Sequence, residues 1–198
     1  MQQEQLLNEF IKAKAILKGH FILSSGLHSD TYMQCARVLM NHERSEKLCS
    51  ILANKLITKL GNNFADIVVA PAMGGVVVGY EMGRHLGLDA IFCERVNGRF
   101  ELRRGFEIKE NDRVLVVEDV VTTGLSSLES YECIRRNGGQ VVAQCSLIDR
   151  SNGQAAEKLG VPFVPLIDVD VKVFNENSVP DNLKNIEAIK PGSRFIKK

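Results

Sequence analysis

The sequence predicts an α/β fold in which helices cover both faces of a mainly parallel sheet, and two observations predict it. Short aliphatic runs such as "DIVVA" and "RVLVVE" recur between residues 66 and 167. They are apolar on both faces, as strands of buried parallel sheets are. Segments with helical spacing of apolar residues separate these runs, which is typical of alternating strand and helix units. We therefore expect a doubly wound core of about five strands.

The first sixty residues predict two helices and a pair of short strands. Apolar residues recur every three or four positions over residues 3–17, and Gly19 follows as a candidate C-cap. The runs "HFIL" and "TYMQC" flank the polar turn "SSGLHSD", a pattern that predicts two strands around a loop. A second helix is expected from its candidate N-cap Asn41 to Leu60, before Gly61.

The core elements follow in order along the chain. The expected strands are "DIVVA", "AIFCE", "RVLVVE", "QVVAQCSLID" and "FVPLI", and the expected helices are residues 75–86, 127–136 and 154–159. The segment "ERVNGRFELRRG" has little apolar periodicity and predicts a mobile loop or ribbon, while the polar tail predicts at most a short helix and an edge segment. We expect one domain over residues 1–198, with an N-terminal subdomain over 1–40, the core over 41–170 and a tail over 171–198.

Composition excludes several classes of protein. The 25 Lys and Arg residues nearly balance the 24 Asp and Glu residues, so no global field favours nucleic acid or an anionic membrane. The apolar runs are too short to span a bilayer, and the start "MQQEQ" lacks the features of a signal peptide; we expect a cytoplasmic protein. Five scattered cysteines without a C-x-x-C pair argue against a disulfide framework and against a structural metal.

The stretch "VLVVEDVVTTGLSS" carries the strongest chemical signal. Four aliphatic residues lead into the neighbouring carboxylates Glu118 and Asp119, and then into a loop of Thr, Gly and Ser before a predicted helix. Backbone N–H groups at such a helix start attract a phosphate, and the hydroxyls add donors. The alternative is an ordinary helix N-cap beside two solvated acids, but the complete pattern favours a ligand site.

The same stretch restricts the ligand. Neither G-x-x-x-x-G-K-[ST] nor G-x-G-x-x-G is present, so a nucleoside triphosphate or a dinucleotide is not indicated. Ionised carboxylates only accept hydrogen bonds, so the acid pair needs vicinal hydroxyls, a cation, or both. A ribose 5-phosphate meets these requirements, with its phosphate in the Thr and Ser loop and its hydroxyls on Glu118 and Asp119.

"VLVVEDVVTTG" resembles the phosphoribosyl diphosphate motif of the type I phosphoribosyltransferases. The family fold, a parallel α/β core with a small hood subdomain, agrees with the pattern above. The segments "GHFILSSGLHSDTYMQC", "ERVNGRFELRRGFEI", "IDRSNG" and "KPGSR" resemble the members that act on orotate, so the resemblance extends over nearly the whole chain. It implies transfer of a 5-phosphoribosyl group from phosphoribosyl diphosphate to orotate, with Mg²⁺, in pyrimidine biosynthesis.

The resemblance also implies the site residues. The phosphoribosyl diphosphate site would comprise Glu118, Asp119, Val120, Val121, Thr122, Thr123, Gly124, Leu125 and Ser126, together with Gly74 and Gly75 of "PAMGG". Orotate would contact Thr122, Arg150 and Tyr32. For Arg150 there is an independent reason, since a guanidinium can hold a planar carboxylate through two hydrogen bonds; the ordinary alternatives are a surface arginine and a core tyrosine.

The arginine segment is the third part of the implied site. Family members close this loop over the diphosphate of a neighbouring subunit, which implies a homodimer and makes Arg95 and Arg99 catalytic candidates that stabilise the leaving group. The third catalytic candidate is Asp119, which would either act near C1 of the ribose or only anchor its hydroxyls. The chain departs from the family pattern here, because Val96 and Ser24 stand where many members have lysine. No protein ligand of the Mg²⁺ is implied. Two alternatives stay open: transfer to another base, and a regulator that binds phosphoribosyl diphosphate without chemistry.

Overall fold

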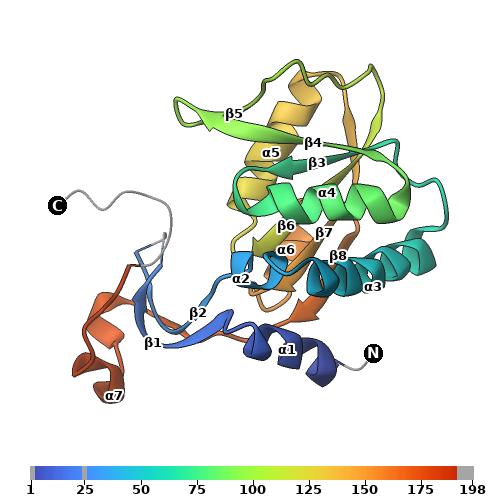
Figure 1. Ribbon diagram of the computed structural model, residues 1–198. Helices are drawn as coiled ribbons and strands as arrows, with labels where there is room; N and C mark the ends of the chain where they lie inside the picture. Colours follow the sequence, from blue (N-terminus) through green and yellow to red (C-terminus); the bar gives the residue numbers. More distant parts are fainter. Residues whose placement is uncertain (1–2, 24–25, 191–198) are drawn as a thin grey trace.

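The centre of the protein is a six-stranded sheet in a computed structural model that describes residues 3–23 and 26–190 (Figure 1). Its strand order is β5-β4-β3-β6-β7-β8. The strands are β3 (Ile67–Pro71), β4 (Asp89–Val96), β5 (Arg99–Leu102), β6 (Arg113–Val121), β7 (Gln140–Asp149) and β8 (Phe163–Asp168). All neighbours pair in parallel except β4 and β5. Five parallel strands with an antiparallel edge strand confirm the predicted α/β class.

Helices cover both faces of this sheet. The helices are α3 (His42–Leu60) and α4 (Gly74–Leu86) on one face, and α5 (Leu125–Arg136) and α6 (Gln154–Leu159) on the other. Side chains alternate along β6: Leu115 and Val117 join the core under α3 and α4, whereas Val114 and Val116 join the core under α5 and α6. Where both faces of a strand are buried, successive positions are apolar, which explains the continuous aliphatic runs.

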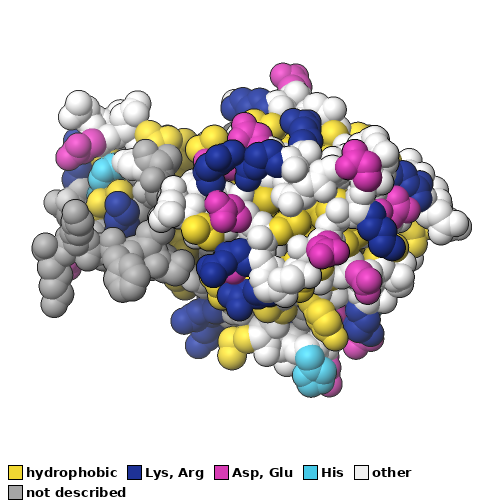
Figure 2. Space-filling view, turned by 90° about the horizontal axis from the view of Figure 1, so that it is seen from above, with side chains coloured by type: hydrophobic (Ala, Val, Ile, Leu, Met, Phe, Trp, Pro, Cys, Tyr) yellow, Lys and Arg dark blue, Asp and Glu magenta, His cyan; other side chains and the backbone are white. Residues whose placement is uncertain are grey.

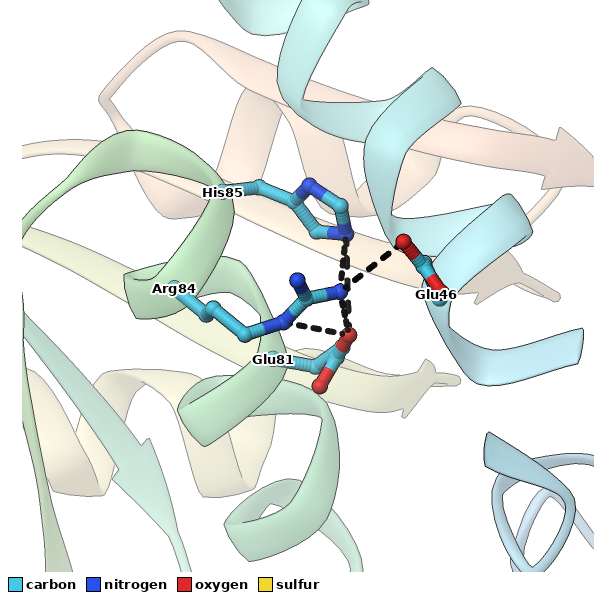
Figure 3. A network of polar contacts seen from close by, with 4 residues as sticks. All are labelled: Glu46, Glu81, Arg84 and His85. Atoms are coloured by element: carbon cyan, nitrogen blue, oxygen red, sulfur yellow. Dashed lines mark hydrogen bonds and ion pairs between the residues drawn. The ribbon is translucent and has the colours of Figure 1, made fainter. Parts of the chain in front are cut away.

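Two local signals set the ends and contacts of α3. Asn41 caps the helix as expected, since its side chain accepts a hydrogen bond from the backbone N–H of Arg44 at 2.9 Å, and Gly61 follows the last turn. On the outer side, Arg84 of α4 bonds Glu81 and lies 3.6 Å from Glu46 of α3 (Figure 3). These groups are partly exposed, so the network adds little stability; the apolar contacts beneath it hold the two helices together.

A second, three-stranded sheet lies beside the carboxyl ends of the core strands. It consists of β1 (Ile16–Ile22), β2 (His28–Met33) and β9 (Val173–Phe174). The short helix α2 (Ala36–Leu39) leads from β2 to the core, while the 3-10 turn Glu176–Ser178 and helix α7 (Asp181–Lys184) follow β9. Figure 1 shows this sheet and α7 projecting from one end of the core. The tail thus contributes a strand to the N-terminal sheet; of "KPGSR" only Lys190 lies within the described residues.

The predicted end of the first helix is wrong. Helix α1 (Gln3–Lys12) ends five residues before Leu17, the residue at which the apolar spacing placed its end. Lys14 adopts a left-handed conformation with φ of 52°, and the N–H of Ala15 bonds the carbonyl of Phe10 at 2.9 Å. This is a Schellman-type helix end with lysine in the place usually taken by glycine. Ile16 then pairs with Met33 of β2, so strand pairing takes the residues that the spacing assigned to the helix.

The arginine segment forms a β-ribbon, the second of the two predicted alternatives. Strands β4 and β5 pair in antiparallel register, with Val96 opposite Arg99. The two residues between them, Asn97 and Gly98, have φ of 48° and 85°. Positive φ at both positions is the type I′ turn that Asn-Gly favours in two-residue hairpins. The ribbon lies at the edge of the sheet and crosses α5 in the view of Figure 1.

No helix in residues 3–23 and 26–190 combines the length and apolar character that crossing a bilayer requires. Charge on the described surface is mixed. Figure 2 shows basic and acidic side chains interspersed over the face that carries the ribbon, in agreement with a formal net charge of +1. Any strong attraction for an anion must therefore arise locally.

Candidate active site

A cavity of about 300 Å³ opens at the carboxyl ends of β3 and β6. These neighbouring strands run parallel, but the chain leaves β3 toward β4 on one side and continues from β6 toward β7 on the other. Such a switch point creates a crevice at the strand ends, where ligands of open α/β sheets bind. Residues 71–72, 74–75, 95, 100 and 118–127 surround the cavity. It thus brings together all eleven residues predicted to bind phosphoribosyl diphosphate, and Arg95 with them.

The hydroxyl loop joins β6 to α5. Thr122 and Thr123 are exposed, and Gly124 begins the helix with φ of 76°. The N-cap residue Gly124 offers no side chain to α5, and the N–H of Leu125 donates a long hydrogen bond of 3.4 Å to Oγ1 of Thr123. The first residues of α5 line the cavity, so their backbone N–H groups can reach a ligand there. The loop hydroxyls and these N–H groups together form a donor set that suits a phosphate.

Glu118 is buried and Asp119 is partly buried at the base of the cavity. Glu118 is 7% exposed, and burial raises its pKa to about 7, because the hydrogen bond from Ser127 offsets only part of the desolvation. Burial also raises the pKa of Asp119, against the effect of the backbone N–H groups of Asp119 and Val120. Neither acid is the solvated side chain of the ordinary N-cap alternative.

The turn "PAMGG" passes close to the acid pair. A Cβ atom placed on Gly74 would lie 2.6 Å from Oδ2 of Asp119, and one on Gly75 would lie 3.0 Å from the carbonyl oxygen of Val117. Any side chain at either position would displace these neighbours. Both glycines are therefore required for the close approach of α4 to β6, and they leave backbone groups open to the cavity. The peptide bond between Ala72 and Met73 is cis.

The ribbon places one of its arginines at the cavity. Arg95 forms an ion pair with Glu129 of α5, donates to the carbonyl of Gly98 at 2.8 Å, and lies 4.4 Å from the ring centroid of Phe100. These contacts hold its guanidinium beside the phosphate loop. Arg99, at the start of β5, is exposed and does not line the cavity; its catalytic role stays a prediction.

Arg103 and Arg104 are further from the site. Both are exposed, and they lie 3.9 Å and 3.1 Å from the carboxylate of Glu94, on the strand opposite. Arg104 also lies 5.6 Å from the ring centroid of Phe92. Neither arginine lines the cavity, and the contacts of both are made at the base of the ribbon.

Of the predicted base-binding residues, Thr122 lines the cavity, whereas Tyr32 and Arg150 lie near Asp119 and outside the lining. The backbone N–H of Arg150 donates to the carbonyl of Val121 at 2.8 Å, which joins the ends of β7 and β6. Burial raises the pKa of Tyr32; the nearby Asp119 raises it further and Arg150 lowers it. Two strands of the main sheet and one of the small sheet therefore bring Tyr32, Asp119 and Arg150 together. In the sequence, Asp119 is 87 residues after Tyr32 and 31 residues before Arg150.

The Arg150 side chain is partly buried, and two of its buried donors have no partner in the part of the chain that the structure describes. Its Nε and Nη2 atoms have no hydrogen-bond partner among the described residues, and burial lowers its pKa. A buried guanidinium without hydrogen bonds is unfavourable. The two free donors are adjacent on one edge of the guanidinium, and they form the fork that binds a carboxylate through two hydrogen bonds.

Phe100 was not predicted to line the cavity, because it was assigned only to an irregular ribbon. Ser127 was predicted as one of the loop hydroxyls that attract a phosphate, but its contact with Glu118 was not predicted. Ser127 donates a short hydrogen bond to Oε1 of Glu118 and is fully buried. A signal was present, because Ser127, Ser130 and Ile134 share the core-facing side of α5 at helical spacing. Polar residues on such a face need buried partners.

Fold and cavity together define a class of protein. The family model described as "Phosphoribosyl transferase domain" matches residues 38–179, which covers the core sheet and the whole cavity. The chain belongs to the phosphoribosyltransferase family and has the predicted type I fold.

Comparison with known proteins shows which phosphoribosyltransferases this chain is similar to in sequence. "Orotate phosphoribosyltransferase" of Erythrobacter litoralis (strain HTCC2594) is 54% identical over 98% of this chain and 99% of that protein. The protein of the same name from Rhizorhabdus wittichii (strain RW1) is 56% identical over 98% and 97%. The crystal structure of orotate phosphoribosyltransferase from Aeropyrum pernix superimposes with a TM-score of 0.68 at 28% identity, covering 82% of this chain and 93% of that one. These relatives confirm the resemblance to the orotate-using members that the four segments predicted.

Proposed function

We propose that this protein transfers the 5-phosphoribosyl group of 5-phospho-α-D-ribose 1-diphosphate to orotate. The products are orotidine 5'-phosphate and diphosphate, a step of pyrimidine biosynthesis. The family and the relatives support the reaction, and the cavity contains groups for each part of the sugar donor. The observation that carries the choice of base is the buried, unpartnered edge of Arg150 beside Tyr32, because orotate is a pyrimidine with a carboxylate.

The phosphoribosyl diphosphate would lie along the cavity. Its 5-phosphate would accept hydrogen bonds from Thr122, Thr123, Ser126 and the first N–H groups of α5, and its 2- and 3-hydroxyls would donate to Glu118 and Asp119. The diphosphate would reach Gly74 and Gly75. This orientation points the ribose C1 toward Asp119 and the base-binding residues.

Orotate would fill the space between β2 and the end of β7. Its carboxylate would pair with Nε and Nη2 of Arg150, its ring would lie against Tyr32, and Thr122 would add a hydrogen bond. N1 would then face C1 of the ribose. Positioning two reactants in this way accounts for much of the acceleration in such transfers, and no covalent nucleophile is required.

Departure of the diphosphate develops positive charge at C1 and negative charge on the leaving group. Arg95, already held at the cavity by Glu129, and Arg99 would stabilise the leaving group. Bound Mg²⁺ would neutralise part of the same charge. We propose that substrate oxygens and water mainly hold this ion, as is usual for Mg²⁺ with phosphates, and we assign it no protein ligand. The two carboxylates at the cavity base make it a favourable region for a cation.

We further propose that the protein acts as a homodimer. Met73, Val77 and Tyr80 form an exposed apolar stripe at the start of α4, with exposed fractions of 78%, 50% and 68%. Apolar stripes of this kind mark interfaces, and this one adjoins the cavity residue Gly74. A two-fold dimer through it would be closed and would let the exposed Arg99 act on the partner subunit's site.

Substitution of Arg150 tests the assignment of the base. In Arg150→Ala we expect KM for orotate to rise by about a hundredfold, the cost of a lost bidentate charged pair, while KM for phosphoribosyl diphosphate changes little. Arg150→Lys is the matched control, because it keeps the charge and loses the fork, and an intermediate KM is expected. Equal loss for both substrates would show that Arg150 does not select the base.

A further inference from the structure

A chain of buried polar side chains lies beneath Glu118, and the reaction as described does not use it. The hydroxyl of Tyr131 donates to Oε1 of Gln144 at 2.5 Å, and Nε2 of Gln144 donates to Oγ of Ser127 at 2.8 Å. Ser127 in turn donates to Oε1 of Glu118. Tyr131, Gln144 and Ser127 are all fully buried. Helix α5 and strand β7 thus link three polar groups in series, and the last of them, Ser127, bonds one carboxylate oxygen.

The order of donors in this chain is determined by chemistry. A phenol and a serine hydroxyl each have one proton to donate, and the amide of Gln144 has one accepting and one donating end. When Tyr131 donates first, every hydroxyl proton in the chain has an acceptor, and the last acceptor is the carboxylate. In the reverse order the proton of Tyr131 would have no acceptor. The chain therefore favours the ionised form of Glu118.

Ionisation of Glu118 is otherwise disfavoured where it lies. Desolvation is the largest effect on this carboxyl, and the neighbouring Asp119 adds repulsion. The other titratable groups facing it are Tyr131 from α5 and Cys93 from β4, while Arg95 of β4 lines the same cavity. Among the effects that act on Glu118, only the hydrogen bond from Ser127 lowers its pKa.

We propose that Tyr131 and Gln144 are positioning residues that act through Ser127 on Glu118. They hold Oε1 of the carboxylate and oppose its protonation, so that Oε2 is available to accept a hydrogen bond from a ribose hydroxyl in the cavity. The proposal rests on the proposed function, since it takes the ligand to be phosphoribosyl diphosphate. It extends the ribose site to residues that never touch the sugar.

The pH dependence of ligand binding distinguishes a positioning role of this chain from a purely structural one. If the buried network only stabilised the core, removing one of its hydrogen bonds would lower thermal stability. The pH dependence of ligand affinity would then stay the same. A positioning chain alters the pH at which Glu118 loses its proton. Without the hydrogen bond from Ser127 the pKa of Glu118 rises. When the pH is lowered, binding of the sugar is therefore lost at a higher pH than in the unaltered protein.

Calorimetric titration with phosphoribosyl diphosphate and Mg²⁺, without orotate, over about pH 6 to 9 tests this. For Ser127→Ala we expect about tenfold weaker binding near pH 7, with the midpoint of the acidic loss raised by about one pH unit. Tyr131→Phe, which removes one oxygen and keeps the ring, should shift the midpoint in the same direction by less. Ser130→Ala is the matched control: Ser130 is buried on the same helix and donates only to the carbonyl of Ser127, so no shift is expected.

The outcomes separate the two proposals. An unshifted midpoint in both Ser127→Ala and Tyr131→Phe would overturn the positioning chain, as would an equal shift in Ser130→Ala. If the unaltered protein binds no phosphoribosyl diphosphate at any pH, the proposed function is wrong. The proposed role of Tyr131 and Gln144 is then also wrong, because it requires this ligand. Binding with the expected shifts but without use of orotate would support the chain and refute the choice of base.

Discussion

Replacing Glu118 by glutamine should stabilise the ligand-free protein while it weakens binding of the sugar. The pKa of Glu118 rises from 4.5 to about 7 on folding, a difference of about 2.5, and each pKa unit corresponds to about 1.4 kcal/mol. The folded state thus favours the protonated acid. The contribution of Glu118 to the free energy of unfolding is most favourable below about pH 4.5, where the acid is protonated in both states. It is lost as the pH rises to about 7, and above pH 7 the ionised group lowers the free energy of unfolding by about 3 kcal/mol. Glu118→Gln removes this cost, and its amide oxygen can still accept the hydrogen bond from Ser127.

Urea unfolding at about pH 5 and pH 8 measures the effect. We expect the free energy of unfolding of Glu118→Gln to exceed that of the unaltered protein by about 3 kcal/mol at pH 8 and by under about 1 kcal/mol at pH 5. Glu187→Gln, at an exposed position, is the matched control and should change little at either pH. Calorimetry should show weaker binding of phosphoribosyl diphosphate to Glu118→Gln at pH 8. A gain in stability that is equal at both pH values would refute the reasoning.

Three further changes test other parts of the site. Arg99→Ala should lower kcat by about tenfold or more with little change in KM for orotate or in thermal stability, because Arg99 is exposed and is proposed to act on the leaving group; unchanged steady-state kinetics would remove it from the mechanism. Gly74→Ala would place a Cβ 2.6 Å from Oδ2 of Asp119, so KM for phosphoribosyl diphosphate should rise by about tenfold; normal kinetics would show that Asp119 can move freely. Tyr80→Glu puts a charge on the apolar stripe and should shift sedimentation from dimer to monomer; an unchanged dimer would place the interface elsewhere.

The fold could be predicted where its signals are local. Strand β7 and helix α6 have the predicted bounds, residues 140–149 and 154–159, because burial on both faces of a strand and glycines beside a helix are visible in a short window. The end of α1 and the strand β9 were not found in this way. They depend on pairing with β2, where Ile16 meets Met33 and Val173 meets Ser29, and such pairing over long separations leaves no local pattern.

The candidate site shows the same division. The acid pair and hydroxyl loop are consecutive in sequence, so their chemistry could be predicted and the structure places them in one cavity. Tyr32 and Arg150 were found only through the resemblance, since each alone has the pattern of an ordinary residue. Gln144 and Tyr131 were missed because their importance lies in contacts between β7 and α5, which burial patterns alone do not specify.

One measurement tests the central claim most directly. Consumption of orotate, followed by absorbance in the presence of phosphoribosyl diphosphate and Mg²⁺, should be compared with consumption of uracil, hypoxanthine and adenine under the same conditions. We predict turnover of orotate that depends on both phosphoribosyl diphosphate and Mg²⁺, with the other three bases left unused. Preference for another base, or binding of phosphoribosyl diphosphate without turnover of any base, would contradict the proposed function.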